Sequence, residues 1–261
     1  MFELIIFLLG LAVGSFLNVC VYRLPAGESV VSPPSHCRAC GVRLGPADLI
    51  PVLSYILRRG RCRSCGAPFS ARYALVELAT GVLFVWCFFV FGLGPSLLKA
   101  LILTSFLVVI TLIDFDHQLI YDKVLVWLAG AGVAINLSFA YAPLWGSALT
   151  LPVGPLDMLL GGLLGGGLLL AIAVVTRGGM GGGDVKFAAA LGLWFGWQQT
   201  LLAIFLSFLA GGLGGGALLL LRLRKRKDLI PFGPFIAAGA FVALLYGPDI
   251  VAWYVSHFLR R

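Results

Sequence analysis

Residues 96–113 read SLLKALILTSFLVVITLI, a run in which only Lys99 is charged, and Asp114-Phe115-Asp116 follows at once. A helix rises about 1.5 Å per residue, so a run of this length nearly crosses a hydrocarbon core of about 30 Å. Lipid offers no hydrogen-bond partners to the backbone, which leaves a helix as the structure of such a segment. The run therefore predicts a membrane span that ends at carboxylates.

Similar runs recur along most of the chain. The sequence has 261 residues, of which 60% are hydrophobic and only 11% are charged, too few for a soluble domain of this length. We therefore predict an all-α polytopic membrane protein with about eight transmembrane helices, the sixth of which is short and glycine-rich enough to be tilted, broken or re-entrant. The predicted spans are residues 2–22, 73–93, 96–113, 124–142, 157–176, 185–198, 200–221 and 230–247.

Lysine and arginine are distributed unevenly between the loops. Sixteen of the nineteen lie in residues 23–72, 114–123, 177–186 and 222–228, which share one side of the membrane in this scheme. Cytoplasmic loops carry an excess of basic residues, so these segments are predicted to face the cytoplasm and both termini the opposite side. The net charge of +8 then reflects topology, and without a recognisable binding module no nucleic-acid partner is expected. The basic run 222–227 is interpreted as an anchor to anionic membrane lipids.

Residues 23–72 form the only long polar segment, and they contain two Cys-x-x-Cys pairs. The first pair is Cys37 and Cys40, the second is Cys62 and Cys65, and each is followed by glycine. Four cysteines at this spacing are typical of a structural zinc site with all four positions filled. Two disulfides or a redox pair are the alternative, which a cytoplasmic location disfavours.

These interpretations divide the chain into three segments. Residues 1–22 form a first transmembrane helix, 23–72 a cytoplasmic zinc-binding loop domain, and 73–261 a transmembrane bundle. The first helix is read as a retained span rather than a signal peptide, because it lacks a basic start and ends at Arg23 rather than at a small-residue cleavage site.

Asp114 ends the third predicted span and Asp184 opens the sixth, so both are expected at the same membrane face. Ionisable groups at membrane depth are costly and are functional candidates by default. Two adjacent carboxylates cannot both ionise easily, and a pair that shares a proton can act as base and acid in hydrolysis. The glycines Gly181 and Gly183 would let a substrate backbone approach Asp184.

The other nearby charges have simpler interpretations. Asp116 and Asp122 are read as helix-capping groups or substrate contacts rather than as chemical groups, and Asp122 is well placed to cap the fourth span. Lys186 lies two residues beyond Asp184 and could favour its charged form. The candidate substrate-binding residues are Asp116, Asp122, Gly181, Gly183 and Lys186. A Gly-x-Gly-Asp stretch arises easily by chance in a chain with 34 glycines, so this motif alone is weak.

Taken in order, the motifs resemble the bacterial type IV prepilin peptidase family of type IV pilus and type II secretion systems. The resemblance covers nearly the whole chain. It rests on residues 14–19 and 22–25, the two Cys-x-x-Cys pairs, residues 68–73 and 76–78, the Asp-x-Asp motif with its third aspartate, Gly181-Gly182-Gly183-Asp184, and Ile230-Pro231-Phe232-Gly233-Pro234-Phe235.

The resemblance implies a Gly-x-Gly-Asp aspartic protease whose catalytic pair maps onto Asp114 and Asp184. It implies prepilin and pseudopilin substrates with a short basic leader, cut at the cytoplasmic face of the bacterial inner membrane. It also implies N-methylation of the new amino terminus with S-adenosylmethionine. No methyl-donor loop is recognisable, and the region of the cysteine loop and Glu77 is the suspected place.

Two other classes of protein are considered. A cation-coupled transporter would explain membrane aspartates as ion ligands, but it would not explain the four cysteines, and the spans show no clear inverted repeat. A thiol-redox membrane protein would use the Cys-x-x-Cys pairs directly. Replacing Cys37 and Cys62 by serine separates these readings, since a redox function would vanish, whereas a protease with a structural zinc loop would keep some cleavage.

Overall fold

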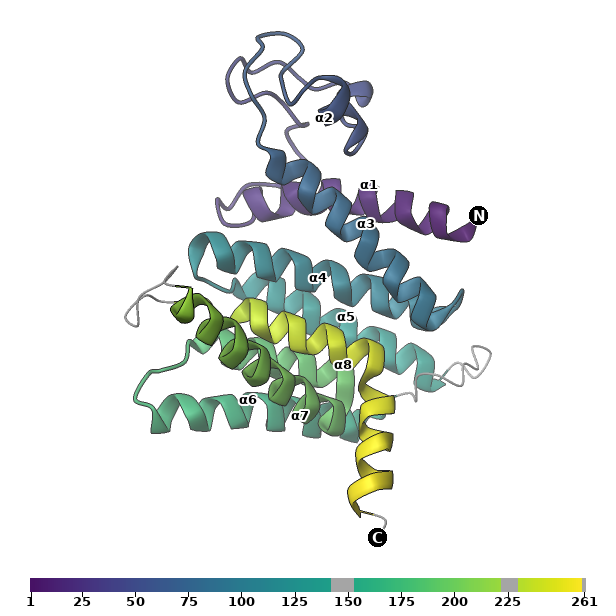
Figure 1. The fold of residues 1–261 in the computed structure, drawn as a ribbon, viewed down its shortest axis with the longest axis vertical. Coiled ribbons are helices and arrows are strands. Elements are labelled where there is room, and N and C mark those ends of the chain that lie inside the picture. The colour runs from purple at the N-terminus through teal and green to yellow at the C-terminus, as the bar shows by residue number, and fades with distance from the viewer. Residues whose placement is uncertain (142–152, 222–229, 260–261) are drawn as a thin grey trace. The chain divides into compact units, whose positions relative to one another are not determined.

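The computed structural model describes residues 1–141, 153–221 and 230–259, and their regular structure is helical apart from two isolated β-bridges (Figure 1). The helices are α1 (Phe2–Arg23), α2 (Leu53–Leu57), α3 (Ala71–Phe91), α4 (Pro95–His117), α5 (Asp122–Tyr141), α6 (Pro155–Val175), α7 (Gly182–Leu220) and α8 (Gly233–Tyr254), with a 3-10 turn at Pro46–Asp48 and a π-helical turn at Val255–Leu259.

The predicted helical membrane fold is confirmed. Within the described residues, seven helices are long and apolar enough to cross a membrane, namely α1 and α3 to α8. Many large apolar side chains of these helices are not covered by other parts of the protein, as expected of surfaces that face lipid. The basic run 222–227, interpreted as a lipid anchor, lies outside the described residues.

The chain forms two compact units, Met1–Val109 and Ile110–Arg261. In the first, α1 and α3 pack at a glycine contact, where a Cβ on Gly10 would lie 2.7 Å from the Cα of Gly81. Small residues let helix backbones approach closely, which is a main source of helix association in lipid. Nearby, the Asn18 side chain donates a hydrogen bond to the Tyr73 carbonyl at 3.0 Å and ties the two helices together where the polar loop leaves them.

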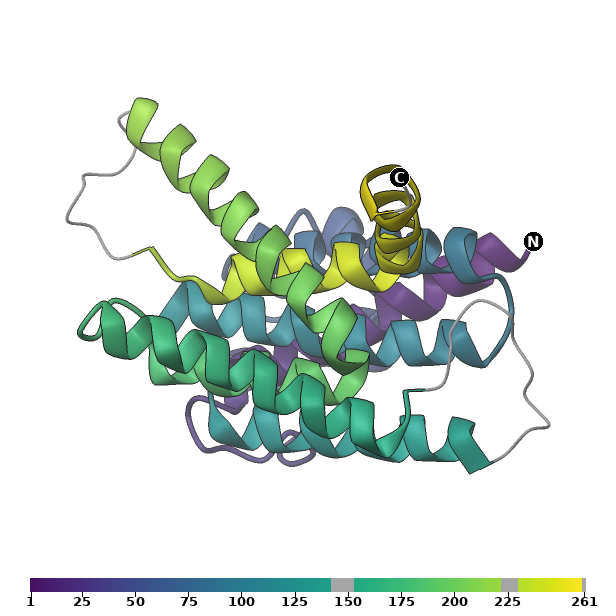
Figure 2. The same cartoon turned by 90° about the horizontal axis from the view of Figure 1, so that it is seen from below.

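In the second unit, α7 has a break at Gly196 that folds it back on itself. Gly196 has φ +70° and ψ 178°, a conformation that glycine adopts without strain. The two arms approach the same residue of α6, since a Cβ on Gly165 would meet the Ala188 carbonyl oxygen at 2.5 Å and the Thr200 methyl at 3.0 Å. The predicted spans 185–198 and 200–221 thus correspond to the two arms of α7, on either side of the break. Figure 2 shows the second arm in light green.

Side chains from α5 hold the turn of α7. Asn136 is fully buried and donates to the carbonyls of Leu193 and Trp194 at 2.8 and 3.2 Å. The Trp194 indole N–H in turn donates to the Leu128 carbonyl at 2.8 Å. A break leaves helix carbonyls without their usual N–H partners, and these bonds satisfy part of that need inside an apolar bundle.

Candidate active site and metal centre

The four cysteines of the loop come together as the sequence predicts. The Sγ atoms of Cys37, Cys40, Cys62 and Cys65 all lie within 4.8 Å of one another. All four are free thiols. Four sulfurs in a cluster of this size could hold a metal ion, and thiolate sulfur is a donor that favours zinc. We call these four residues the cysteine cluster.

Each pair sits on a turn of the same design. The Cys37 N–H donates to the Val42 carbonyl at 2.9 Å, and the Gly41 N–H donates back to the Cys37 carbonyl at 2.7 Å. Cys62 repeats both bonds at 2.8 and 3.0 Å, with Ala67 and Gly66 as the partners. Both glycines have φ near +70°, which explains why glycine follows each second cysteine.

The turn also prepares the first thiol for metal binding. Backbone N–H groups of Cys40 and Ala39 point at the Cys37 sulfur and lower the pKa of that thiol to about 6. A thiolate is the form that binds a metal, so these N–H groups favour the metal-binding form of Cys37.

Asp114 lies on α4, one turn before the helix ends, and it is only 5% exposed. Its Oδ2 atom accepts a hydrogen bond from the Gly233 N–H at 3.0 Å. Gly233 is the first residue of α8, where backbone N–H groups have no partner within the helix. The start of α8 therefore fixes the Asp114 carboxylate.

Gly233 is a site residue that the sequence analysis did not single out. A Cβ at this position would lie 2.5 Å from the Asp114 Oδ2 atom, so a larger residue here would have to displace the Asp114 carboxylate. The signal was present in Phe232-Gly233-Pro234, where glycine precedes a proline in the first turn of a helix. The partner, 119 residues earlier in the chain, was not predictable from that signal.

Asp184 is the third residue of α7 and is half-buried. Its Oδ2 atom accepts the Gly181 N–H at 3.3 Å, so the glycine loop turns toward this carboxylate. The Asp114 carboxylate lies near enough to interact with Asp184 electrostatically. Beside them, a Cβ on Gly183 would lie 3.0 Å from the Ile120 Cβ, which brings the start of α7 against the segment that follows α4.

The structure places the remaining predicted residues around this pair. The Lys186 ammonium donates to both carboxylate oxygens of Asp122, at 2.8 and 2.9 Å, so it is engaged with Asp122. Asp122 is the first residue of α5, and the pair is well exposed at 59% and 66%. Asp116 is exposed on the last turn of α4.

Comparison with known proteins gives consistent results along the chain. Residues 8–91 match the model described as the bacterial peptidase A24 N-terminal domain, and residues 101–216 match the type IV leader peptidase family. A protein of Aeromonas hydrophila named prepilin leader peptidase/N-methyltransferase is 38% identical over 98% of this chain and 94% of its own. Proteins of the same name in Bacillus subtilis (strain 168) and Pseudomonas aeruginosa are 38% and 36% identical, over 97% and 98% of this chain and 97% and 94% of their own. No solved structure matches.

With seven helices among its described residues long and apolar enough to cross a membrane, the chain is a polytopic membrane protein. The chain belongs to the prepilin leader peptidase/N-methyltransferase family, which confirms the resemblance seen in the sequence.

Proposed function

We propose that this protein is an aspartic endopeptidase of the bacterial inner membrane, which removes the short basic leader of type IV prepilins and pseudopilins at the cytoplasmic face. The observation that carries the proposal is the placement of Asp114 and Asp184 from separate helices within electrostatic reach of each other. Family membership supplies the substrate class, and the excess of basic residues in the predicted cytoplasmic loops supports the orientation.

The pair would hydrolyse a peptide bond without a covalent intermediate. One carboxylate is ionised and takes a proton from water as the water oxygen attacks the peptide carbonyl. The other is protonated and donates to the carbonyl oxygen, where charge develops. Breaking the C–N bond returns a proton to the leaving nitrogen, so the products are a carboxylic acid and a free amine.

We further propose that the protein methylates the amine that cleavage releases. S-adenosylmethionine would supply the methyl group, whose S–C bond breaks as an N–C bond forms and the amine loses a proton. The cysteine cluster would hold a structural Zn²⁺, because four thiol ligands leave no open position for catalysis. Asp116, with Gly181 and Gly183, would contact the substrate leader and backbone near the aspartate pair.

The test of the proposed function is cleavage of a purified prepilin by the purified protein in detergent. Mass spectrometry of the product should show loss of the leader and, with S-adenosylmethionine added, a gain of one methyl group at the new amino terminus. A wild-type protein that leaves a folded prepilin intact under these conditions would contradict the proposal.

Gly233→Ala is expected to lower the cleavage rate about a hundredfold, because the added methyl group would meet the Asp114 carboxylate and move it. The measurement is kcat on a prepilin, with thermal unfolding in parallel. Gly212→Ala is the matched control, since a Cβ there meets no atom within 4 Å. Equal rates for wild type and Gly233→Ala would show that the Gly233 contact does not position Asp114.

The ion pair of Asp122 and Lys186 is expected to contribute only about 0.5 kcal/mol to stability, because both side chains are well exposed. Its expected effect is on activity, since it joins the first turn of α5 to the second turn of α7, two residues from Asp184. Lys186→Glu should lower kcat several-fold, and adding Asp122→Lys should restore part of it. A double variant no better than the single one would assign Lys186 a role other than this link.

A further inference from the structure

A short apolar stretch of the loop between α1 and α3 is exposed on the surface of the first unit. Residues 49–57 include the helix α2, and their large aliphatic side chains other than Val52 are 41% to 73% exposed. These side chains are those of Leu49, Ile50, Leu53, Ile56 and Leu57. A large exposed group of apolar side chains commonly marks a protein or membrane interaction site. We call residues 49–57 the apolar segment.

The polarity of α2 is the reverse of that expected in a domain surrounded by water. The first, fourth and fifth residues of this helix are apolar, and this spacing places them on one face, which is exposed. The polar Ser54 is half-buried, and Arg58, which follows the helix, pairs with Asp48 at 2.7 Å. A surface helix in water turns its apolar face toward the core. The outward apolar face of α2 therefore fits an apolar surrounding.

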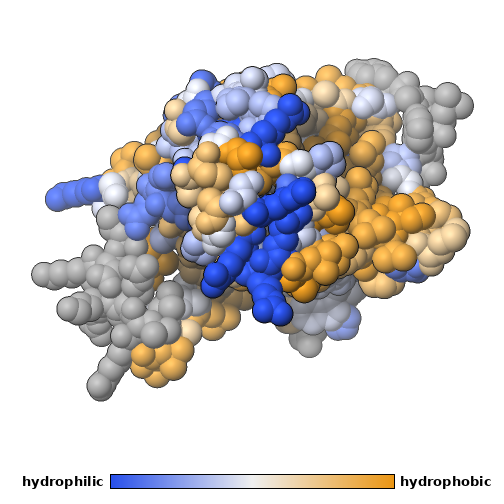
Figure 3. Space-filling view, turned by 90° about the horizontal axis from the view of Figure 1, so that it is seen from above, coloured by the Kyte–Doolittle hydropathy of each residue, from blue (hydrophilic) through white to orange (hydrophobic). Residues whose placement is uncertain are grey.

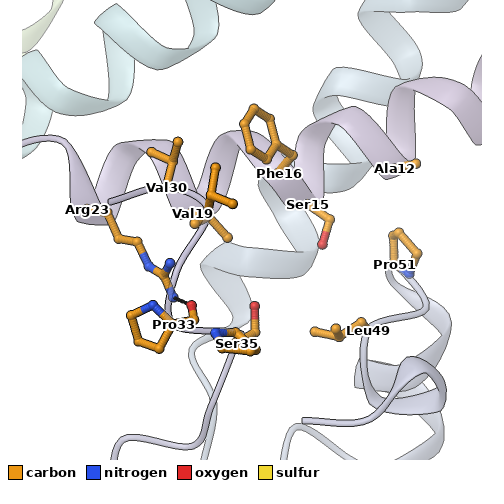
Figure 4. A pocket seen from close by; sticks show the side chains of 12 residues that line it. Ala12, Ser15, Phe16, Val19, Arg23, Val30, Pro33, Ser35, Leu49 and Pro51 are labelled. Atoms are coloured by element: carbon orange, nitrogen blue, oxygen red, sulfur yellow. Dashed lines mark hydrogen bonds between the residues drawn. The ribbon is translucent and has the colours of Figure 1, made fainter. Parts of the chain in front are cut away.

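The apolar segment lies alongside α1 rather than beyond the end of that helix. Leu49 and Pro51 line a hollow of about 390 Å³ whose opposite wall is α1 around Ser15 (Figure 4). Ser15 precedes Arg23, the last residue of α1, by eight residues, which is about 12 Å along the helix. The whole helix is about 33 Å long and the hydrocarbon core about 30 Å thick. If α1 crosses the membrane, this part of the hollow lies at the depth of the bilayer.

A hydrogen bond to α3 holds the segment at this level. The Val52 N–H donates to the Oε2 atom of Glu77 at 2.7 Å, and Glu77 is 8% exposed. Glu77 lies six residues beyond Ala71, the first residue of α3, which is about 9 Å along that helix. The segment is thus fixed beside two predicted spans, at a level inside the ends of both.

The exposed face of α1 continues into the apolar segment. Ala12 and Phe16 are exposed on one face of α1, and both line the hollow that Leu49 closes from the other side. Residues 59–63, just after the segment, contribute three exposed arginines. On the face that carries the loop, hydrophobic surface lies next to strongly hydrophilic side chains (Figure 3). Apolar side chains flanked by basic ones are complementary to acyl chains flanked by anionic headgroups.

We propose that the apolar segment inserts into the lipid leaflet on the side of the loop, beside α1, and anchors the cysteine-containing loop to the membrane. This is the cytoplasmic leaflet in the proposed orientation. Leu53, Ile56 and Leu57 would contact acyl chains, and the arginines of residues 59–63 would lie among the headgroups. This contact with lipid is separate from the proposed peptidase and methyltransferase activities.

The test is photo-crosslinking of the full-length protein in vesicles of phosphatidylethanolamine and phosphatidylglycerol. Benzoylphenylalanine in place of Leu57 should form adducts with lipid, and base hydrolysis of the lipid esters should leave a fatty acid on the peptide. Phe89, which is 70% exposed on α3, is the positive control position. Ser64, which is exposed between two cysteines of the cluster, is the negative control position.

The expected result is a fatty-acid adduct at Leu57 in a yield close to that at Phe89, with none at Ser64. Adding Ile56→Glu should lower the yield at Leu57 several-fold, because a carboxylate is costly among acyl chains. Thermal unfolding in detergent should not change, since Ile56 is 64% exposed. Crosslinks from Leu57 to headgroups only or to a second copy of the chain would overturn the proposal, as would an unchanged yield in Ile56→Glu or no lipid adduct where Phe89 reacts.

Discussion

Asp184→Asn and Asp114→Asn should each lower prepilin cleavage by about a thousandfold or more, because an amide can neither take a proton from water nor return one to the carbonyl oxygen. The change removes one oxygen but keeps the size of the side chain, and in Asp114→Asn the retained amide oxygen can still accept the Gly233 N–H. The fold should therefore survive. The measurement is kcat in detergent, with thermal unfolding as a check on the fold.

Two further aspartates provide controls for this experiment. Asp249→Asn changes an exposed carboxylate on α8 and should leave cleavage unchanged. Asp116→Asn tests the residue most easily confused with Asp114, and as a proposed contact of the basic leader it should raise KM while kcat stays near the wild-type value. Normal kcat in Asp114→Asn together with a lost kcat in Asp116→Asn would move the catalytic role to Asp116.

The second large effect is expected at the cysteine cluster. Cys37→Ser should abolish stoichiometric metal binding and unfold the loop between α1 and α3, because structural zinc sites contribute about 10 kcal/mol or more of binding free energy to folding. The measurements are metal content per chain and the rate of proteolysis within residues 23–72. Cleavage should fall only in part, since the aspartate pair belongs to the second unit.

The matched control is Cys20→Ala, which removes a buried cysteine of α1 that is not part of the cluster. Metal content should stay at the wild-type level in that variant. Complete loss of cleavage in Cys37→Ser with metal retained would favour a thiol chemistry instead. Strong protection of the loop from proteolysis after chelation would show that the loop folds without metal.

The sequence allowed much of this protein to be predicted, for reasons that are local. Span length and the spacing of Cys37, Cys40, Cys62 and Cys65 are properties of short stretches of chain, and the structure has the long apolar helices and brings those four sulfurs together. The placement of Asp114 and Asp184 at one membrane face, expected from counting membrane crossings between them, stays a prediction.

The features that were not predicted depend on contacts between distant residues. The hydrogen bond from Gly233 to Asp114 and the ion pair of Lys186 with Asp122 join helices whose relative position no short pattern encodes. The turn at Gly196 was not predicted, because the chain contains many glycines and nothing local distinguishes this one. What distinguishes it is a contact from another helix, the hydrogen bond that the Asn136 amide donates to the Leu193 carbonyl. The partner of Asp122 was likewise not predicted. Its position in the sequence suggested a helix cap or a substrate contact, and the structure shows that its carboxylate accepts hydrogen bonds from Lys186 of α7.

The turn at Gly196 also bears on how the protein is made. The first arm of α7, from Gly182 to Phe195, has fourteen residues and is about 21 Å long, too short to cross a membrane by itself. We expect that a translocon does not insert so short a segment by itself, and that this arm enters the bilayer together with the arm that follows it. The end that carries Asp184 would then reach its final depth only after the whole hairpin has been synthesised, late in biogenesis, so an immature chain would lack a complete peptidase site.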